Sequence, residues 1–116
     1  MIQIIYGDEP YYISLIKRNL FSKVTYADFN ISHFEAFDEA AYDSCTTYPV
    51  MDDIRVVFLD LDRLTQLDTP LFWKYLEKPS QFCQLLILVR NVYSRIKIYK
   101  ELSKRKLIRE VSKLSD

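Results

Sequence analysis

The sequence predicts an α/β domain with three αβα layers, built on a five-stranded parallel sheet. Short apolar, β-branched runs alternate with helical stretches along all 116 residues. The central runs are apolar throughout, as is typical of parallel strands buried on both faces. This length suits one domain with its own core, so we expect residues 1–116 to form a single domain.

The first predicted strand covers residues 2–6 and stops at Gly7, the only glycine in the chain. A helix over residues 9–22 is expected to follow it. Asp8 is the predicted N-cap because aspartate is a preferred capping residue. Pro10 is tolerated in the first helical turn, where its missing N–H costs nothing.

The same alternation continues to the end of the chain. We expect further strands at 31–35, 55–59, 84–89 and 107–111, and further helices at 38–46, 69–77 and 94–105. The predicted N-caps of these helices are Asp38, Thr69 and Ser94. Right-handed crossovers leave two common strand orders, the P-loop order 5-1-4-3-2 and the receiver order 2-1-3-4-5.

The turn after the first strand has the geometry of a phosphate-binding loop without its chemistry. A helix N-terminus behind a buried strand attracts anions, but two acids follow the glycine here. The second glycine and the lysine of G-x-x-x-x-G-K-[ST] are replaced by Tyr12 and Ile13, and only the hydroxyl of Ser14 remains. The positions of this degenerate phosphate loop are Gly7, Asp8, Glu9, Tyr12, Ile13 and Ser14. We therefore expect a nucleotide-type fold that binds no nucleotide or other cofactor, or else an ordinary capped helix.

A receiver-like phosphoacceptor is the alternative function. Asp8, Glu9 and Asp60 would lie together at the carboxyl ends of parallel strands, where ligands bind. A receiver also needs a hydroxyl after its fourth strand and a lysine after its fifth. Residues 89–91 contain no hydroxyl, and only Lys113 could serve as that lysine. Acids that cap loops and helices are the simpler interpretation.

The remaining reactive residues have no partners at a recognisable spacing. His33 lies inside a predicted strand, and Cys45 and Cys83 form no C-x-x-C pair and have no neighbouring base. We therefore expect no catalytic residue and no metal site. Two thiols without a signal peptide, and apolar runs about half a membrane span long, predict a cytoplasmic protein without membrane contact.

Charge is balanced in total and separated along the chain. Residues 28–77 contain 11 acids and three bases, whereas residues 90–113 contain nine bases and two acids. A basic helix at one end is typical of nucleic-acid contact. It is equally typical of a solvated face beside acidic neighbours.

The loop before the third strand carries apolar residues at its tip. Pro49 keeps Tyr48 extended, and Val50 and Met51 follow, with two acids after them. Methionine is an adaptable contact residue, and two adjacent apolar side chains make a compact plug for a pocket on a partner. The alternative is that the pair folds back onto the core.

Taken together, these residues resemble the N-terminal domain of the DNA polymerase III delta subunit, the clamp-opening subunit of the bacterial clamp loader. The matching segments are Ile5 to Pro10, Tyr48 to Val57, Tyr75 to Ser80, Leu85 to Val89, Lys97 to Leu102 and Ile108 to Val111. Their order and spacing favour this family over a receiver.

The resemblance implies an AAA+-type, RecA-like domain of order 5-1-4-3-2 that is not an enzyme by itself. It implies that Val50 and Met51, with Tyr48 and Pro49 beside them, wedge into a hydrophobic pocket of the sliding clamp, the beta subunit. The family usually has a larger, Leu-Phe-like pair there. The resemblance covers about the first third of a full-length member. The lid and collar domains, which join the other loader subunits, are expected to be absent, and DNA is expected to be met only indirectly.

Overall fold

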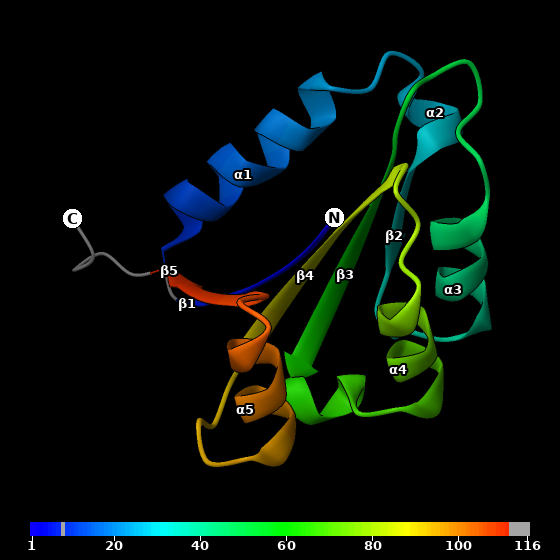
Figure 1. Cartoon of the computed structure of the whole chain (residues 1–116). Coiled ribbons are helices and arrows are strands. Elements are labelled where there is room, and N and C mark those ends of the chain that lie inside the picture. The colour runs from blue at the N-terminus through cyan, green and yellow to red at the C-terminus, as the bar shows by residue number, and fades with distance from the viewer. Residues whose placement is uncertain (8, 112–116) are drawn as a thin grey trace.

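One or two helices separate each pair of successive strands in the described chain (Figure 1). The structure, a computed structural model, describes residues 1–7 and 9–111. The elements in chain order are β1 (Ile2–Gly7), α1 (Pro10–Ser22), α2 (Ala27–Asn30), β2 (Ile31–Phe34), α3 (Glu39–Thr46), β3 (Arg55–Arg63), the 3-10 helix η1 (Leu64–Leu67), α4 (Pro70–Glu77), β4 (Cys83–Asn91), α5 (Lys97–Lys104) and β5 (Ile108–Val111).

The five strands form one parallel sheet in the order β2-β3-β4-β1-β5. Read from its other edge, this is the predicted P-loop order 5-1-4-3-2, which is therefore confirmed. β1 lies between β4 and β5, where Ile4 is in register with Ile87 on one side and Ile108 on the other. The receiver order, which places the first strand between the second and third, is wrong for this chain.

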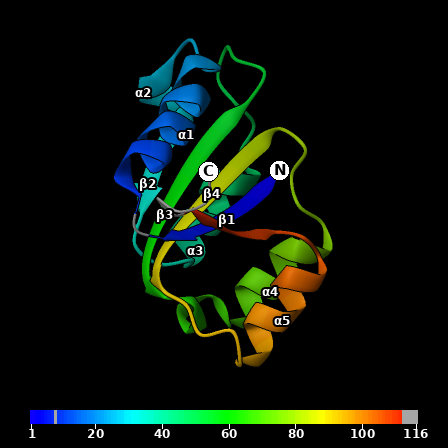
Figure 2. The ribbon, with the colours of Figure 1, turned by 90° about the vertical axis from the view of Figure 1, so that its left-hand side faces the viewer.

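The helices cover the two faces of the sheet unequally (Figure 2). Helices α3, α4 and α5 pack on one face, where the larger apolar cluster joins Val57 and Ile87 of the sheet to Phe72 of α4. Helix α1 crosses the other face, where Leu20 packs in a smaller cluster with Phe58. Successive residues of β3 alternate between the two clusters, as the two-residue period of a strand requires.

Two short elements were not predicted, and two strands are longer than expected. Helix α2 and η1 each span four residues, too few to show a helical period in the sequence. β3 continues to Arg63 and β4 to Asn91, and these two residues are in register. Asp60 consequently lies inside β3, in register with Leu88. The prediction that Asp60 follows the strand was wrong because the ladder continues through its polar end.

Helix starts agree with the predicted caps at two of four positions. The carboxylate of Asp38 accepts a hydrogen bond from the Ala41 N–H at 3.0 Å, which caps α3 as expected. Thr69 caps α4 in the same way. Ser94 does not cap α5, which begins at Lys97 after a residue without a side-chain cap. The turn 93–96 precedes the helix instead.

The first helix is capped by the second of the two acids. α1 begins at Pro10, and the Glu9 carboxylate accepts a hydrogen bond from the Tyr11 N–H at 3.2 Å. Asp8, the predicted cap, lies outside the described residues. The negative charge expected at this helix start is therefore present, on Glu9.

Gly7 is required by the close approach of β1 and β5. Its φ of 142° lies in the region that favours glycine, and an added β carbon would stand 1.7 Å from the carbonyl oxygen of Val111. The only glycine of the chain thus serves the packing of two strands.

We predict that Gly7→Ala destabilises the domain by about 2 kcal/mol or more, because the added methyl group meets β5 backbone. Urea unfolding followed by circular dichroism measures this loss. Ser14→Ala, on the exposed surface of α1, is the control and should change stability by less than about 0.5 kcal/mol. Equal stability of the two variants would contradict the assigned role of Gly7.

Candidate functional site

The two candidate sites lie at opposite ends of the sheet (Figure 1). Residues 47–54, here called the 47–54 loop, join α3 to the first residue of β3. Because the strands are parallel, this loop lies at the amino end of the sheet. The degenerate phosphate loop follows β1 and lies at the carboxyl end, where nucleotide-type folds bind their ligands.

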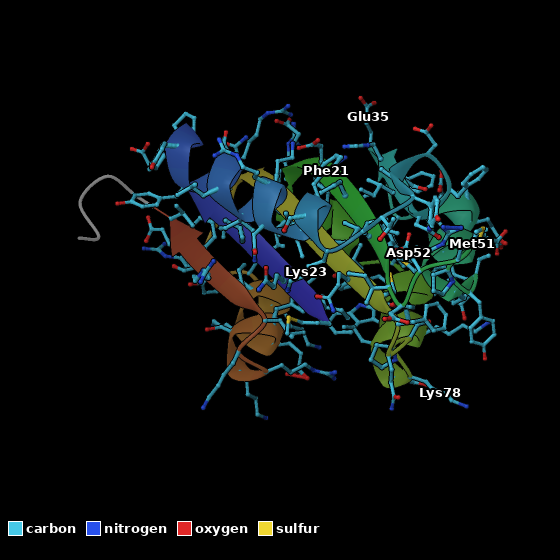
Figure 3. The ribbon with its side chains drawn as sticks, turned by 90° about the horizontal axis from the view of Figure 1, so that it is seen from above. Phe21, Lys23, Glu35, Met51, Asp52 and Lys78 are labelled. Carbon is cyan, nitrogen blue, oxygen red and sulfur yellow. The ribbon has the colours of Figure 1, made fainter. Side chains whose placement is uncertain are left out.

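The apolar residues of the 47–54 loop are exposed. Met51 is 74% exposed, Tyr48 76% and Val50 43%, while Pro49 is half-buried. Met51 lies at the periphery of the molecule when it is viewed from above (Figure 3). Val50 and Met51 therefore do not fold back onto the core, and their side chains are available to a partner.

Asn30, at the end of α2, fixes the backbone of this loop. It is fully buried, and its side-chain oxygen accepts a hydrogen bond from the Val50 N–H at 2.6 Å. Its amide nitrogen lies 2.8 Å from the Val50 carbonyl oxygen and also within hydrogen-bonding distance of Tyr26 and Asp52 oxygens. One side chain thus satisfies both backbone polar groups of Val50.

Asp52, on the other side of Met51, connects the loop to the residues that precede α2 in the sequence. Its carboxylate accepts hydrogen bonds from the backbone N–H groups of Thr25 at 2.9 Å and Tyr26 at 2.8 Å. A third bond comes from Asn30 at 2.8 Å. These bonds, first that from Thr25, hold the pKa of Asp52 below its usual range.

Met51 sits between these two anchored residues in an unfavourable backbone conformation. Its φ is 58°, a left-handed value that residues other than glycine and asparagine rarely adopt. Such strain costs on the order of 1 kcal/mol and persists where surrounding contacts determine the conformation. Here Asn30 and Asp52 supply those contacts on either side.

Aromatic side chains surround the loop. Phe29 and Tyr26, on and next to α2, are 61% and 41% exposed, and the Phe29 carbonyl oxygen accepts a hydrogen bond from buried Arg55 of β3 at 2.8 Å. The ring of Tyr48 packs on Phe82 at a centroid distance of 4.8 Å. The amino end of the sheet therefore presents several exposed apolar side chains beside Val50 and Met51.

Among its described residues, the degenerate phosphate loop offers no lysine or arginine side chain to a phosphate. Glu9 occupies the start of α1 with its own carboxylate. Tyr12, in the place of the second glycine, is exposed and packs edge-to-face on Tyr11 at 5.6 Å. Ile13 and Ser14, partly buried and exposed respectively, offer no cation.

Two of the three acids of the receiver alternative lie in the described part of the chain, Glu9 at the start of α1 and Asp60 in the third strand of the sequence. Asp60 is part of β3, and Asp8 and Lys113 lie outside the described residues. Within residues 1–7 and 9–111, no three His, Cys, Asp or Glu side chains gather in a group that could hold a metal ion. None of the helices in that part of the chain combines the length and apolar character needed to cross a membrane.

The histidine and the cysteines belong to the packing of the sheet. His33 stacks on Phe58 at 4.9 Å. Cys45 and Cys83 are buried thiols; a hydrogen bond with Cys83, followed by burial, raises the pKa of Cys45. A thiol held in its protonated form is a poor nucleophile.

A model of the family described as DNA polymerase III, delta subunit, matches residues 4–112. The chain belongs to the DNA polymerase III delta subunit family. The resemblance to the N-terminal domain of this subunit is thereby confirmed.

The fold of this delta-family domain also occurs in a solved structure, the Bacillus subtilis DNA clamp loader delta protein (YqeN). The two share 21% sequence identity and a TM-score of 0.75, over 97% of this chain and 38% of that chain. At this identity the likeness shows the fold, and the chain spans little more than a third of that protein's length. No curated protein matched the sequence.

The sequence of this delta-family domain indicated the exposed pair Val50 and Met51. It did not indicate the two residues that hold their loop in place. Asn30 and Asp52 are ordinary polar residues 22 positions apart, and no local pattern connects them. The one available signal was an asparagine directly before the apolar run of β2, a position where a polar side chain must find partners once it is buried.

We predict that Asn30→Ala destabilises the domain by about 2–3 kcal/mol, because the N–H and carbonyl of Val50 lose their buried partner. Urea unfolding measures the loss, and hydrogen exchange should show faster exchange at the Val50 amide. Asp28→Ala, an exposed change in the same helix, serves as the control with an effect below about 0.5 kcal/mol. An Asn30→Ala variant as stable as this control would refute the claim that Asn30 holds the backbone of the 47–54 loop.

We also predict an acid-dependent weakening that runs through Asp52. Its pKa is lowered in the folded state, so its contribution to stability is present above the unfolded-state pKa and is lost as pH falls through the folded-state pKa. The difference in unfolding free energy between wild type and Asp52→Asn should therefore shrink steadily on acidification. Urea unfolding at a series of pH values measures it, and a difference independent of pH would be the opposing result.

Proposed function

We propose that this domain is a non-catalytic module of a clamp loader in DNA replication and that it binds the ring-shaped sliding clamp. The contact is made by Val50 and Met51, with Tyr48 and Pro49 beside them. The observation that carries the proposal is the exposure of this adjacent apolar pair on a loop held by buried Asn30. Family membership and the name of the Bacillus subtilis protein support the choice of partner.

The energetics favour a contact of moderate strength. Burying the Val50 and Met51 side chains supplies roughly 3–5 kcal/mol before the costs of association. Because the loop is already held by Asn30 and Asp52, little further ordering is needed on binding, which raises the net affinity. Flanking contacts from exposed Phe29 and Tyr26 would add to the buried area.

The mechanism we propose for opening the clamp is differential binding. A ligand shifts an equilibrium between two states only by its difference in affinity for them. If the apolar pair fits a clamp with one interface open better than a closed clamp, binding favours the open ring without any chemical step. Contacts with other loader subunits belong, in this proposal, to parts of a family member beyond these 116 residues.

The lack of a lysine or arginine side chain at the described part of the degenerate loop supports the non-catalytic assignment. Glu9 fills the helix start, and Tyr12 and Ile13 stand where a glycine and a lysine are needed. In this proposal, the domain uses the amino end of the nucleotide-type sheet and leaves the carboxyl end without a ligand.

The test is calorimetric titration of the sliding clamp from the same organism with the Val50→Ala/Met51→Ala variant. We predict that clamp binding weakens by roughly a hundredfold, because most of the buried apolar area is removed. The melting temperature should stay nearly unchanged, since both side chains are exposed. A double variant that binds as wild type does would refute the assignment.

Two matched variants separate contact from folding. Leu15→Ala/Tyr93→Ala removes two exposed apolar side chains from other parts of the surface and should bind the clamp normally. In the Met51→Asn variant, asparagine tolerates the left-handed backbone conformation but makes no apolar contact. This variant should therefore keep its stability and lose affinity for the clamp. Normal binding by Met51→Asn together with weak binding by Leu15→Ala/Tyr93→Ala would place the contact elsewhere.

A further inference from the structure

A groove of about 510 Å³ runs between α4 and α5, away from both sites described above. Trp73 of α4 lies on one side of it, and Lys97, Lys100 and Lys104 of α5 lie on the other. Figures 1 and 2 show α4 and α5 at the end of the molecule opposite to the 47–54 loop, and in Figure 1 the short helix η1 lies between them. The groove and the proposed clamp contact therefore do not compete for space.

The acidic side chains of the groove already have partners. Asp68 accepts a hydrogen bond from the indole N–H of Trp73 at 2.8 Å, and Glu101 forms an ion pair with Arg105 at 3.6 Å. Across residues 1–7 and 9–111, the three lysines take part in no ion pair. Four bases and two acids line the groove, so it keeps a net positive charge.

The start of α5 adds to this positive potential. Ile96 precedes the helix and provides no side-chain cap, and the first turn contains no acid. The unpaired N–H groups at a helix start carry partial positive charge, which is unfavourable beside a lysine. Lys97 is the first residue of the helix, so an anion bound here would relieve the repulsion between them.

The three lysines form a stripe rather than a compact pocket. Positions i, i+3 and i+7 lie on one face of a helix, and a rise of 1.5 Å per residue spreads them over about 10 Å. All three side chains are exposed. One strand of a duplex carries a phosphate per ~3.4 Å of helix axis, so a stripe of this length matches roughly three phosphates of one strand.

Trp73 is poorly placed to stack on a base. It is half-buried, and the guanidinium of Arg105 stands over its ring at 6.0 Å. Single-stranded nucleic acids are usually held by exposed aromatic rings on which bases stack. The groove therefore favours contact with phosphates over contact with unpaired bases.

We propose that this groove binds the phosphodiester backbone of duplex nucleic acid, without sequence preference, through Lys97, Lys100 and Lys104. This inference does not rest on the proposed clamp contact. It goes beyond the expectation that the domain meets DNA only indirectly, and it assigns a ligand to the basic segment that sequence analysis left open.

The chain contains a single tryptophan, so the emission of Trp73 reports on the groove directly. The experiment titrates the protein with a fluorescein-labelled DNA duplex of about 20 base pairs at about 50 mM salt and follows both Trp73 emission and duplex anisotropy. We expect a saturable change in both signals. The slope of log K against log salt should be close to −3, because three lysines neutralise three phosphates.

Charge-reversal variants test the assignment. Lys97→Glu/Lys100→Glu/Lys104→Glu should weaken duplex binding at least tenfold. Arg18→Glu/Lys23→Glu/Lys78→Glu makes the same change in net charge at exposed positions outside the groove and should weaken it less than threefold. Circular dichroism confirms that both variants are folded, and Lys97→Gln/Lys100→Gln/Lys104→Gln repeats the test without introducing acids.

Three results would overturn the proposal. One is a duplex that changes neither Trp73 emission nor anisotropy at low salt. Another is an equal loss of affinity in the groove variant and the control variant. The third is a polyglutamate peptide that binds more tightly than the duplex, which would make an acidic protein the occupant of this groove.

Discussion

The hydrogen bonds between Asn30 and both backbone polar groups of Val50 are the interaction on which the candidate site depends. They are made by a buried side chain, so replacing them with water would require the site to open. Together with the Asp52 carboxylate, they fix the residues on either side of Met51 and hold its strained conformation. The backbone of the apolar pair is thus anchored to a buried side chain, while the Val50 and Met51 side chains lie at the surface.

The fold keeps the strand order of a nucleotide-binding domain, while the residues at its two ends differ from those of a phosphate-binding domain. Strand order and connectivity follow the P-loop arrangement, yet at the carboxyl end Glu9 caps α1 with its own carboxylate and Gly7 lies against the backbone of β5. The exposed apolar side chains gather at the amino end, around α2 and the 47–54 loop. A basic groove between α4 and α5 forms a third surface. The proposed contacts with the clamp and with duplex nucleic acid therefore use separate faces of one small domain.

Much of the fold was predictable because its signals are local. An apolar run specifies its own strand, as in β1, β3 and β4. A capping residue specifies the start of the helix next to it, as Asp38 and Thr69 do. The hydrogen bonds between Asn30 and Val50 were not predictable, since the two residues are 20 positions apart and no period or motif relates them. The start of α5 was misplaced because Ser94 has the composition of a cap, while the chain forms a turn there and begins its helix at Lys97.

A crystal structure of the domain bound to its sliding clamp tests the central claim most directly. The account predicts that Val50 and Met51 are buried in an apolar pocket of the clamp, with the Asn30–Val50 hydrogen bonds and the positive φ of Met51 unchanged from the free domain. A complex formed through another face, with both side chains left in solvent, would contradict it.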